Sequence, residues 1–162
     1  MSEILADLFR HNLWANLSLI DFCAELPDEV LATNVPGTFG NIRDTLAHLV
    51  DAEDFYATAL TGGLPERHSV LAESSPAIAA LRDPARQSGE ALIALAQTLH
   101  GDPVVTIFRR GEDQRYRSSF LLVQAIDHAV EHRTQVKTAL TQAGYEPPET
   151  DGWTWDTTRL TL

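Results

Sequence analysis

The chain has 162 residues, a length that suits one folded domain with its own apolar core. Acidic residues outnumber basic residues 23 to 12, so the formal net charge is −11. A field of that sign repels phosphate backbones and anionic lipid headgroups, which argues against a nucleic-acid or membrane-surface partner. The single cysteine, Cys23, excludes an internal disulfide, fits a reducing compartment and is expected to pack in the core. No secretory signal and no apolar run of about 18 residues is present, so we expect one cytoplasmic domain, residues 1–162.

Apolar residues recur at helical spacing in four segments of the chain. The expected helices span about residues 2–26, about residues 41–60, a third segment that ends near residues 100–101, and about residues 118–143. The start of the third helix is open, because Asp83-Pro84 either caps a new helix or kinks one that began near Ser75. Four long helices with one apolar stripe each indicate an all-α four-helix bundle.

The segment before the last helix breaks the helical pattern. Residues 104–108 are rich in strand formers, and Gly111 stands at a possible turn. This pattern predicts a short irregular or two-stranded excursion. Ser118 or Ser119 is the expected cap of the helix that follows.

Two further segments are expected outside the long helices. Residues 62–76 form a connection, marked by a glycine pair and two prolines. The tail after residue 144 begins with too much proline for a long helix. We expect Trp153 and Trp155 to pack back on the body.

Two histidines, His128 and His132, lie four residues apart in the last expected helix. On a helical wheel both share the side of Leu121, Ala125 and Val136, so both imidazoles point inward. Side chains at this spacing are neighbours, and two ring nitrogens can bind one ion at about 2.0–2.1 Å each. Hydrogen-bonded core histidines are the alternative. Metal binding has one advantage over this alternative, because a single ion satisfies the acceptor nitrogens of both rings in an interior without water.

A third candidate ligand, His48, lies in the second expected helix beside the apolar stripe. Metal sites in bundles are built from side chains on facing helices, and three protein ligands with open positions are typical of a catalytic site. The alternative is a boundary histidine that Asp44 or Asp51 caps. The other histidines are expected off the core face, in a loop and at a helix end. They are His11, His68 and His100.

Four polar residues are candidates for the surroundings of the site. Asn12 and Asn16 fall on the apolar face of the first helix, where a buried amide needs partners, and ordinary helix–helix hydrogen bonding is their alternative. Gln135 points inward, either to support the site or for structure. Asp51 could orient a ligand histidine through its other ring nitrogen. Arg133 faces away from the ligands on the wheel, which favours a salt bridge to another helix.

Two familiar metal motifs do not match. In H-E-x-x-H proteases a glutamate follows the first histidine and acts as the general base, whereas this chain has Ala129 there and Glu131 before the second histidine. A di-iron carboxylate bundle needs Glu-x-x-His pairs on two helices. Glu131 and His132 are adjacent, and Asp51 and Glu53 do not complete that pattern.

Three stretches together resemble the DinB-like superfamily, which includes the bacterial damage-inducible and YfiT-type proteins. The first expected helix contains "HNLWANLSLIDFCAEL", the second "PGTFGNIRDTLAHLVDAEDFY" with His48, and the last helix and tail "HAVEHRTQVKTALTQAGYEPPETDGWTW" with His128 and His132. The family often has glycine where this chain has Thr134. That departure is expected to touch a small neighbour of the site and not a ligand.

The resemblance implies a four-helix bundle that is often a homodimer, with a divalent metal, commonly nickel or zinc, held by three histidines. Characterised relatives include transferases and isomerases that use mycothiol, bacillithiol or glutathione. We therefore expect a metal-dependent, thiol-dependent S-transferase that acts on a small electrophile, with a low-molecular-weight thiol as cosubstrate. The alternatives are a metal-dependent hydrolase, a non-catalytic, stress-linked metal-binding dimer, and a metal-free bundle with a hydrophobic ligand pocket. The family name is not evidence of DNA chemistry.

Overall fold

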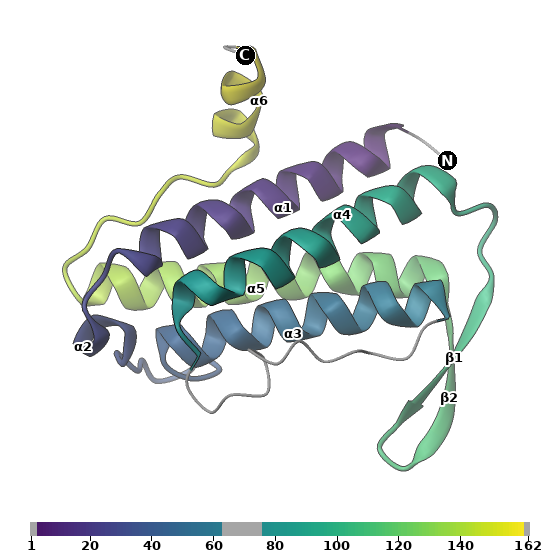
Figure 1. The fold of residues 1–162 in the computed structure, drawn as a ribbon, viewed down its shortest axis with the longest axis horizontal. Helices are drawn as coiled ribbons and strands as arrows, with labels where there is room; N and C mark the ends of the chain where they lie inside the picture. Colours follow the sequence, from purple (N-terminus) through teal and green to yellow (C-terminus); the bar gives the residue numbers. More distant parts are fainter. Residues whose placement is uncertain (1–2, 63–75, 161–162) are drawn as a thin grey trace.

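A computed structural model of the chain describes residues 3–62 and 76–160. It confirms the all-α bundle with a two-stranded excursion before the last long helix (Figure 1). The four long helices are α1 (Glu3–Ala24), α3 (Ile42–Thr61), α4 (Arg82–Thr98) and α5 (Ser118–Gln142). Helix α1 packs along α4, and α3 packs along both α4 and α5. No helix in this described part is long and apolar enough to cross a membrane.

The helix ends lie close to the expected positions, with local differences. Before α4, a 3₁₀ helix, η2 (Ile78–Leu81), runs directly into its first turn, so Pro84 lies where a missing N–H group costs nothing. Neither serine caps α5, because its N-cap residue is Arg117, and the carboxylate of Asp102 accepts the Ser119 backbone N–H at 2.9 Å. A four-residue helix that the sequence did not predict, α2 (Asp28–Leu31), follows α1. Most of the expected connection at residues 62–76 lies outside the described residues.

The apolar core has two parts that follow one another along the bundle. One cluster contains Leu19, Leu46 and Leu140, and the other contains Phe9 and Leu121 among its members. Along α1, α3 and α5 the two sets are separated by a short stretch that carries buried polar side chains. This polar layer and the histidines both occupy the middle of the bundle.

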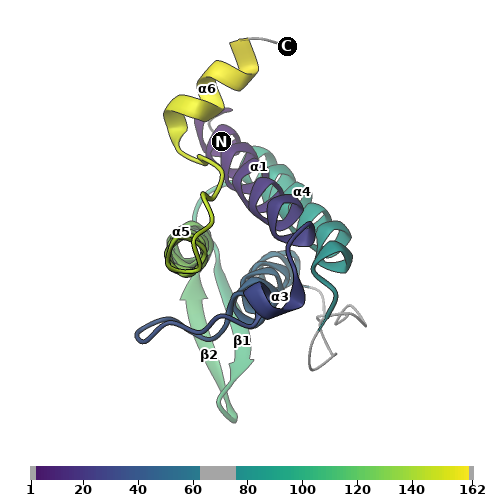
Figure 2. The ribbon, with the colours of Figure 1, turned by 90° about the vertical axis from the view of Figure 1, so that its left-hand side faces the viewer.

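The excursion is an antiparallel hairpin of β1 (Val104–Arg109) and β2 (Glu112–Arg117). Its two turn residues, Arg110 and Gly111, have φ values of 56° and 87°, as a type I′ hairpin turn requires. Strand β1 contacts α3 and β2 contacts α5, and the hairpin projects outward from the side of the bundle that these two helices form (Figure 2).

The tail forms a short helix, α6 (Gly152–Leu160), which stands away from the bundle beside α1 (Figure 1). Trp155 packs on Trp14 with ring centroids 5.4 Å apart, as predicted. The prediction for Trp153 was wrong, since this side chain is 85% exposed. Residues two apart on a helix point about 200° apart, so only one tryptophan can face α1.

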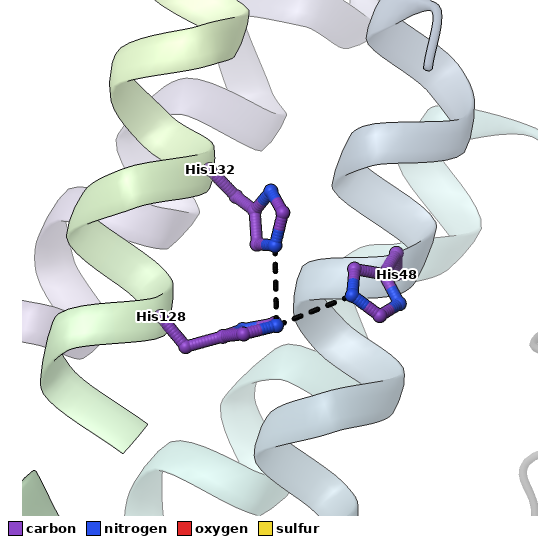
Figure 3. A group of neighbouring side chains, drawn as sticks. All are labelled: His48, His128 and His132. Carbon is purple, nitrogen blue, oxygen red and sulfur yellow. Dashed lines mark hydrogen bonds between the residues drawn. The ribbon is translucent and has the colours of Figure 1, made fainter. Parts of the chain in front are cut away.

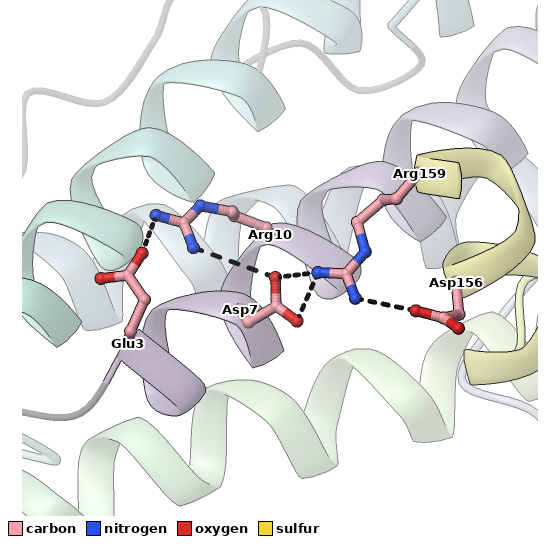
Figure 4. A network of polar contacts seen from close by, with 5 residues as sticks. All are labelled: Glu3, Asp7, Arg10, Asp156 and Arg159. Atoms are coloured by element: carbon pink, nitrogen blue, oxygen red, sulfur yellow. Dashed lines mark hydrogen bonds and ion pairs between the residues drawn. The ribbon is translucent and has the colours of Figure 1, made fainter. Parts of the chain in front are cut away.

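A network of ion pairs connects α6 to α1 (Figure 4). Arg159 contacts Asp156 at 2.9 Å on its own helix and Asp7 of α1 at 2.7 Å. Asp7 also lies 3.9 Å from Arg10, which pairs with Glu3 at 2.7 Å. These pairs are largely exposed, so each contributes little free energy of unfolding, and the network mainly orients α6.

Candidate metal centre

Three histidines from two facing helices bring their ring nitrogens together. His48 projects from α3 toward His128 and His132 of α5 (Figure 3). The Nε2 atom of His128 lies 3.2 Å from Nε2 of His48 and 3.1 Å from Nε2 of His132. Ligand nitrogens about 2.0–2.1 Å from one ion lie about 2.9–3.4 Å apart, depending on the coordination angle. The donor set therefore fits a single divalent ion.

Burial and mutual repulsion favour the neutral form of two of these rings, His48 and His128. Burial, and to a smaller extent the neighbouring His132 and His48, together lower the pKa of His128 to about 4. Burial also lowers the pKa of His48, with a smaller contribution from His132, while the charge of Asp51 acts in the opposite direction. A neutral imidazole keeps the lone pair that a metal ion needs, so His48 and His128 are ready to bind at neutral pH.

Gln135 and Phe39 hold two of the rings in place. The amide oxygen of Gln135 accepts the backbone N–H of Phe39 at 3.0 Å and lies 3.0 Å from Nδ1 of His132. Because this oxygen can only accept, Nδ1 of His132 carries its proton and Nε2 turns its lone pair to the cluster. The Phe39 ring stacks on the His48 ring, with ring centroids 3.9 Å apart and an interplanar angle of 7°. The loop before α3 thus covers the centre from one side.

A cavity of about 490 Å³ opens from the centre toward the hairpin. His48 and His128 line one part of it, and Tyr56 lies edge-on to His128 with ring centroids 6.0 Å apart. The rest of the wall combines aromatic, amide and charged side chains. Among them are Asp51, Phe55, Arg109, Tyr116 and Gln124. Cavities of this size hold small molecules. A metal centre that opens into such a cavity is typical of a site that binds a ligand beside the ion, whereas a structural metal site is closed.

Asn12 and Asn16 do not reach this cavity, and they form the polar layer inside the bundle instead. Both amide nitrogens donate to Oε1 of Glu53, at 2.5 and 2.9 Å. Both amide oxygens accept from Nη1 of Arg133, at 2.6 Å each. Helix–helix hydrogen bonding, the alternative for the asparagines, is what the geometry contains. Arg133 was expected to form a salt bridge to another helix, and among the described residues it instead donates hydrogen bonds to these two amides of α1.

The polar layer holds two ionisable groups away from water. Burial raises the pKa of Glu53 to about 7, although the hydrogen bond from Asn12, the charge of Arg133 and the hydrogen bond from Asn16 lower it. Burial likewise lowers the pKa of Arg133 to about 10, against the charge of Glu53. The two asparagines therefore connect an acid and a base whose charged forms are both costly in this place.

No role was predicted from the sequence for Glu53, Phe39, Tyr56 or Arg109. A signal for Glu53 was available, because it interrupts the apolar stripe of α3 on the side of Leu46 and Leu60. The aromatic and arginine positions gave no such signal. They lie on a loop, at the edge of a stripe and in a hairpin, and only the tertiary structure brings them to the centre.

The remaining histidines stay apart from the centre. Nε2 of His11 lies 2.9 Å from the carbonyl oxygen of Thr150, and His100 is exposed after the end of α4. His68 lies outside the described residues. Thr134, expected beside the site, is on the exposed face of α5, where its hydroxyl donates to the carbonyl of Val130 at 2.8 Å.

The model of the DinB family matches residues 1–159. The chain belongs to the DinB family. Protein DinB of Bacillus subtilis (strain 168) is 24% identical to it over 159 residues, which cover 93% of this chain and 92% of that protein. The match extends over both helices that carry the histidines, so this DinB-family chain combines the predicted family with three histidines positioned to bind a metal ion.

Proposed function

We propose that this DinB-family protein is a divalent-metal-dependent enzyme that transfers a low-molecular-weight thiol to a small electrophile. The observation that carries the proposal is the convergence of three Nε2 atoms at the end of a cavity large enough for a small molecule. Nickel and zinc are the proposed ions, since imidazole nitrogen suits both. We also propose a cytoplasmic location and a homodimer.

A divalent ion bound there would lower the pKa of a thiol or a water molecule and so provide a nucleophile near neutral pH. His48, His128 and His132 would hold the ion, and Gln135 keeps His132 in the required tautomer. In the transfer, sulfur forms a bond to the electrophilic carbon while the leaving group departs with its bonding electrons. The thiol proton passes to the leaving group or to solvent.

The thiol must come from outside the chain. The only cysteine, Cys23, is buried within the apolar core, and burial raises its pKa to about 12. A thiol in that environment stays protonated and is a poor nucleophile. Tyr56 is better placed to assist. Burial raises its pKa, so it keeps its proton on the cavity wall, where it can donate to a leaving group.

A metal-dependent hydrolase is the second candidate, because Asp51 lies on the cavity wall beside His48. A carboxylate in that position could accept a proton from an attacking water molecule. The two candidates differ in whether turnover requires an added thiol.

The first test is the metal content of tag-free protein, measured by mass spectrometry. We expect about one divalent ion per chain in the wild type and loss of that ion in His128→Ala. His100→Ala removes an exposed histidine and should keep the ion. Absence of metal from the wild type, even after reconstitution with nickel or zinc, would contradict the proposal.

Loaded protein then separates the candidates. We expect thiol adducts of an aryl halide to form with mycothiol, bacillithiol or glutathione, and no ester hydrolysis without thiol. Hydrolysis that needs no thiol would favour the second candidate. A cobalt-substituted spectrum that no thiol changes would indicate a non-catalytic centre.

A further inference from the structure

The cavity beside the metal centre has two chemically different ends. His48 and His128 form one end, and the inner face of the hairpin forms the other. Alternate residues of a strand share a face. Ile107 is buried against the bundle, and Arg109, two residues later, therefore points to the same side and lines the cavity.

Arg109 lines the same cavity as Tyr56 and His128. Its charge lowers the pKa of Tyr56, against the larger opposite effect of burial. The Tyr56 ring in turn lies 6.0 Å from the ring of His128. The side chain of Arg109 thus belongs to the wall of this cavity, at its solvent-exposed side.

No carboxylate among the described residues forms an ion pair with this guanidinium. Glu112 is the cross-strand neighbour of Arg109, but it accepts a hydrogen bond from Gln114 at 3.0 Å. Asp51 lies beside His48, at the other end of the cavity. The guanidinium of Arg109 can therefore attract an anion locally, although the chain as a whole has a net charge of −11.

The wall between the two ends is mostly apolar and aromatic. Phe55, Phe120 and Leu121 contribute to it, with Tyr56. Such a surface favours a flat or aliphatic body over a second charge. Among the residues that line the cavity, Arg109 is the one Lys or Arg side chain, so it is the protein group that would bind a carboxylate of the ligand.

We propose that Arg109 binds a carboxylate of the substrate, so that the cavity accepts a small organic acid with its reacting group at the histidines. The acid is either the thiol or the electrophile. The inference rests on the proposed function only for the identity of the reacting group. An arginine fork grips a carboxylate through two parallel hydrogen bonds, which neither glutamine nor lysine reproduces.

The test compares 4-mercaptobenzoate with benzenethiol, which lacks the carboxylate, on zinc-loaded protein by isothermal titration calorimetry. We expect the wild type to bind the acid about tenfold more tightly, as for a charge-assisted hydrogen bond that is partly exposed to water. Arg109→Gln should bind the two thiols equally, and Arg109→Lys should retain part of the preference. The matched control is Arg115→Gln. This residue lies on the outer face of the hairpin, opposite Thr106, and its variant should keep the full preference.

Equal affinities in the wild type, or a preference that survives in Arg109→Gln, would overturn the inference. If the protein takes up no zinc, the proposed function fails but the arginine can still be tested. Saturation-transfer nuclear magnetic resonance on metal-free protein then compares the binding of benzoate with that of its neutral analogue benzamide. Any preference for benzoate in this experiment is independent of the metal. A benzoate signal that only Arg109→Gln abolishes supports the carboxylate site without the metal. Equal signals from the two probes overturn it.

Discussion

At the scale of single residues, the least expected feature is the carboxylate of Glu53 inside the bundle. One of its oxygens accepts from Asn12 and Asn16, and the other has no hydrogen-bond partner among the described residues. Arg133 lies beyond the same two amides. A buried charge without a direct counter-ion is costly, so the protonation of Glu53 must affect the free energy of unfolding.

We expect Glu53→Gln to change how stability depends on pH. The pKa of Glu53 is about 7 in the folded chain and 4.5 as its ordinary value, so the folded state binds the extra proton between these values. The protonated carboxyl therefore contributes its whole stabilisation at pH values below the ordinary pKa. This stabilisation is lost as the pH rises through the pKa of the folded state. The free energy of unfolding of the wild type, relative to Glu53→Gln, should fall by about 3 kcal/mol from about pH 4.5 to about pH 8.

Urea unfolding of both proteins at these two pH values measures the effect. Glu90→Gln, which removes one exposed charge from α4, is the control. Comparing variants cancels the titration of the centre, where the lowered pKa of His128 gives the opposite dependence. Parallel pH profiles for the wild type and Glu53→Gln would contradict a buried, titrating carboxylate.

At the scale of elements, helical periodicity predicted the bundle, since each long helix has one apolar stripe. It also predicted that the α5 pair faces inward and that His48 lies beside the apolar stripe of its helix, because direction on a helix is a local property. The partners of Asn12 and Asn16 could not be predicted. They depend on how far α1 is shifted along α3 and α5, which sequence spacing does not contain. The role of Arg109 depends in the same way on where the hairpin docks.

The junction between the loop before α3 and α5 allows an element-scale prediction. Gln135→Leu keeps a similar volume but removes the oxygen that meets His132 and the Phe39 backbone. Zinc affinity should fall about 10- to 100-fold, as for other partners that orient a ligand histidine. Competition with a chromophoric chelator measures it, and Gln142→Leu, at the exposed end of α5, is the control. Unchanged affinity in Gln135→Leu would mean that Phe39 and packing alone orient the ring.

At the scale of the whole molecule, one side of the bundle exposes apolar surface. A second cavity of about 310 Å³ lies between the ends of α1, α4 and α5. Leucine, valine and isoleucine side chains line most of it, and Leu8 and Val123 on its wall are 49% and 61% exposed. A contiguous apolar surface of this kind is typical of a protein interface.

The proposed homodimer should use this surface, because α1 and α5 present it together and the metal cavity opens elsewhere, toward the hairpin. Val123→Asp places a charged carboxylate on this apolar surface. Removing that carboxylate from water in an interface is costly. Light scattering after size exclusion should show the mass of two chains for the wild type and of one chain for this variant. Val104→Asp alters another exposed valine, on the outer face of the hairpin, and should leave the dimer intact. Circular dichroism distinguishes dissociation from unfolding, because a dissociated bundle keeps its helical signal. A wild type that elutes as one chain at every concentration would exclude the homodimer, and a dimeric Val123→Asp would place its interface on another face.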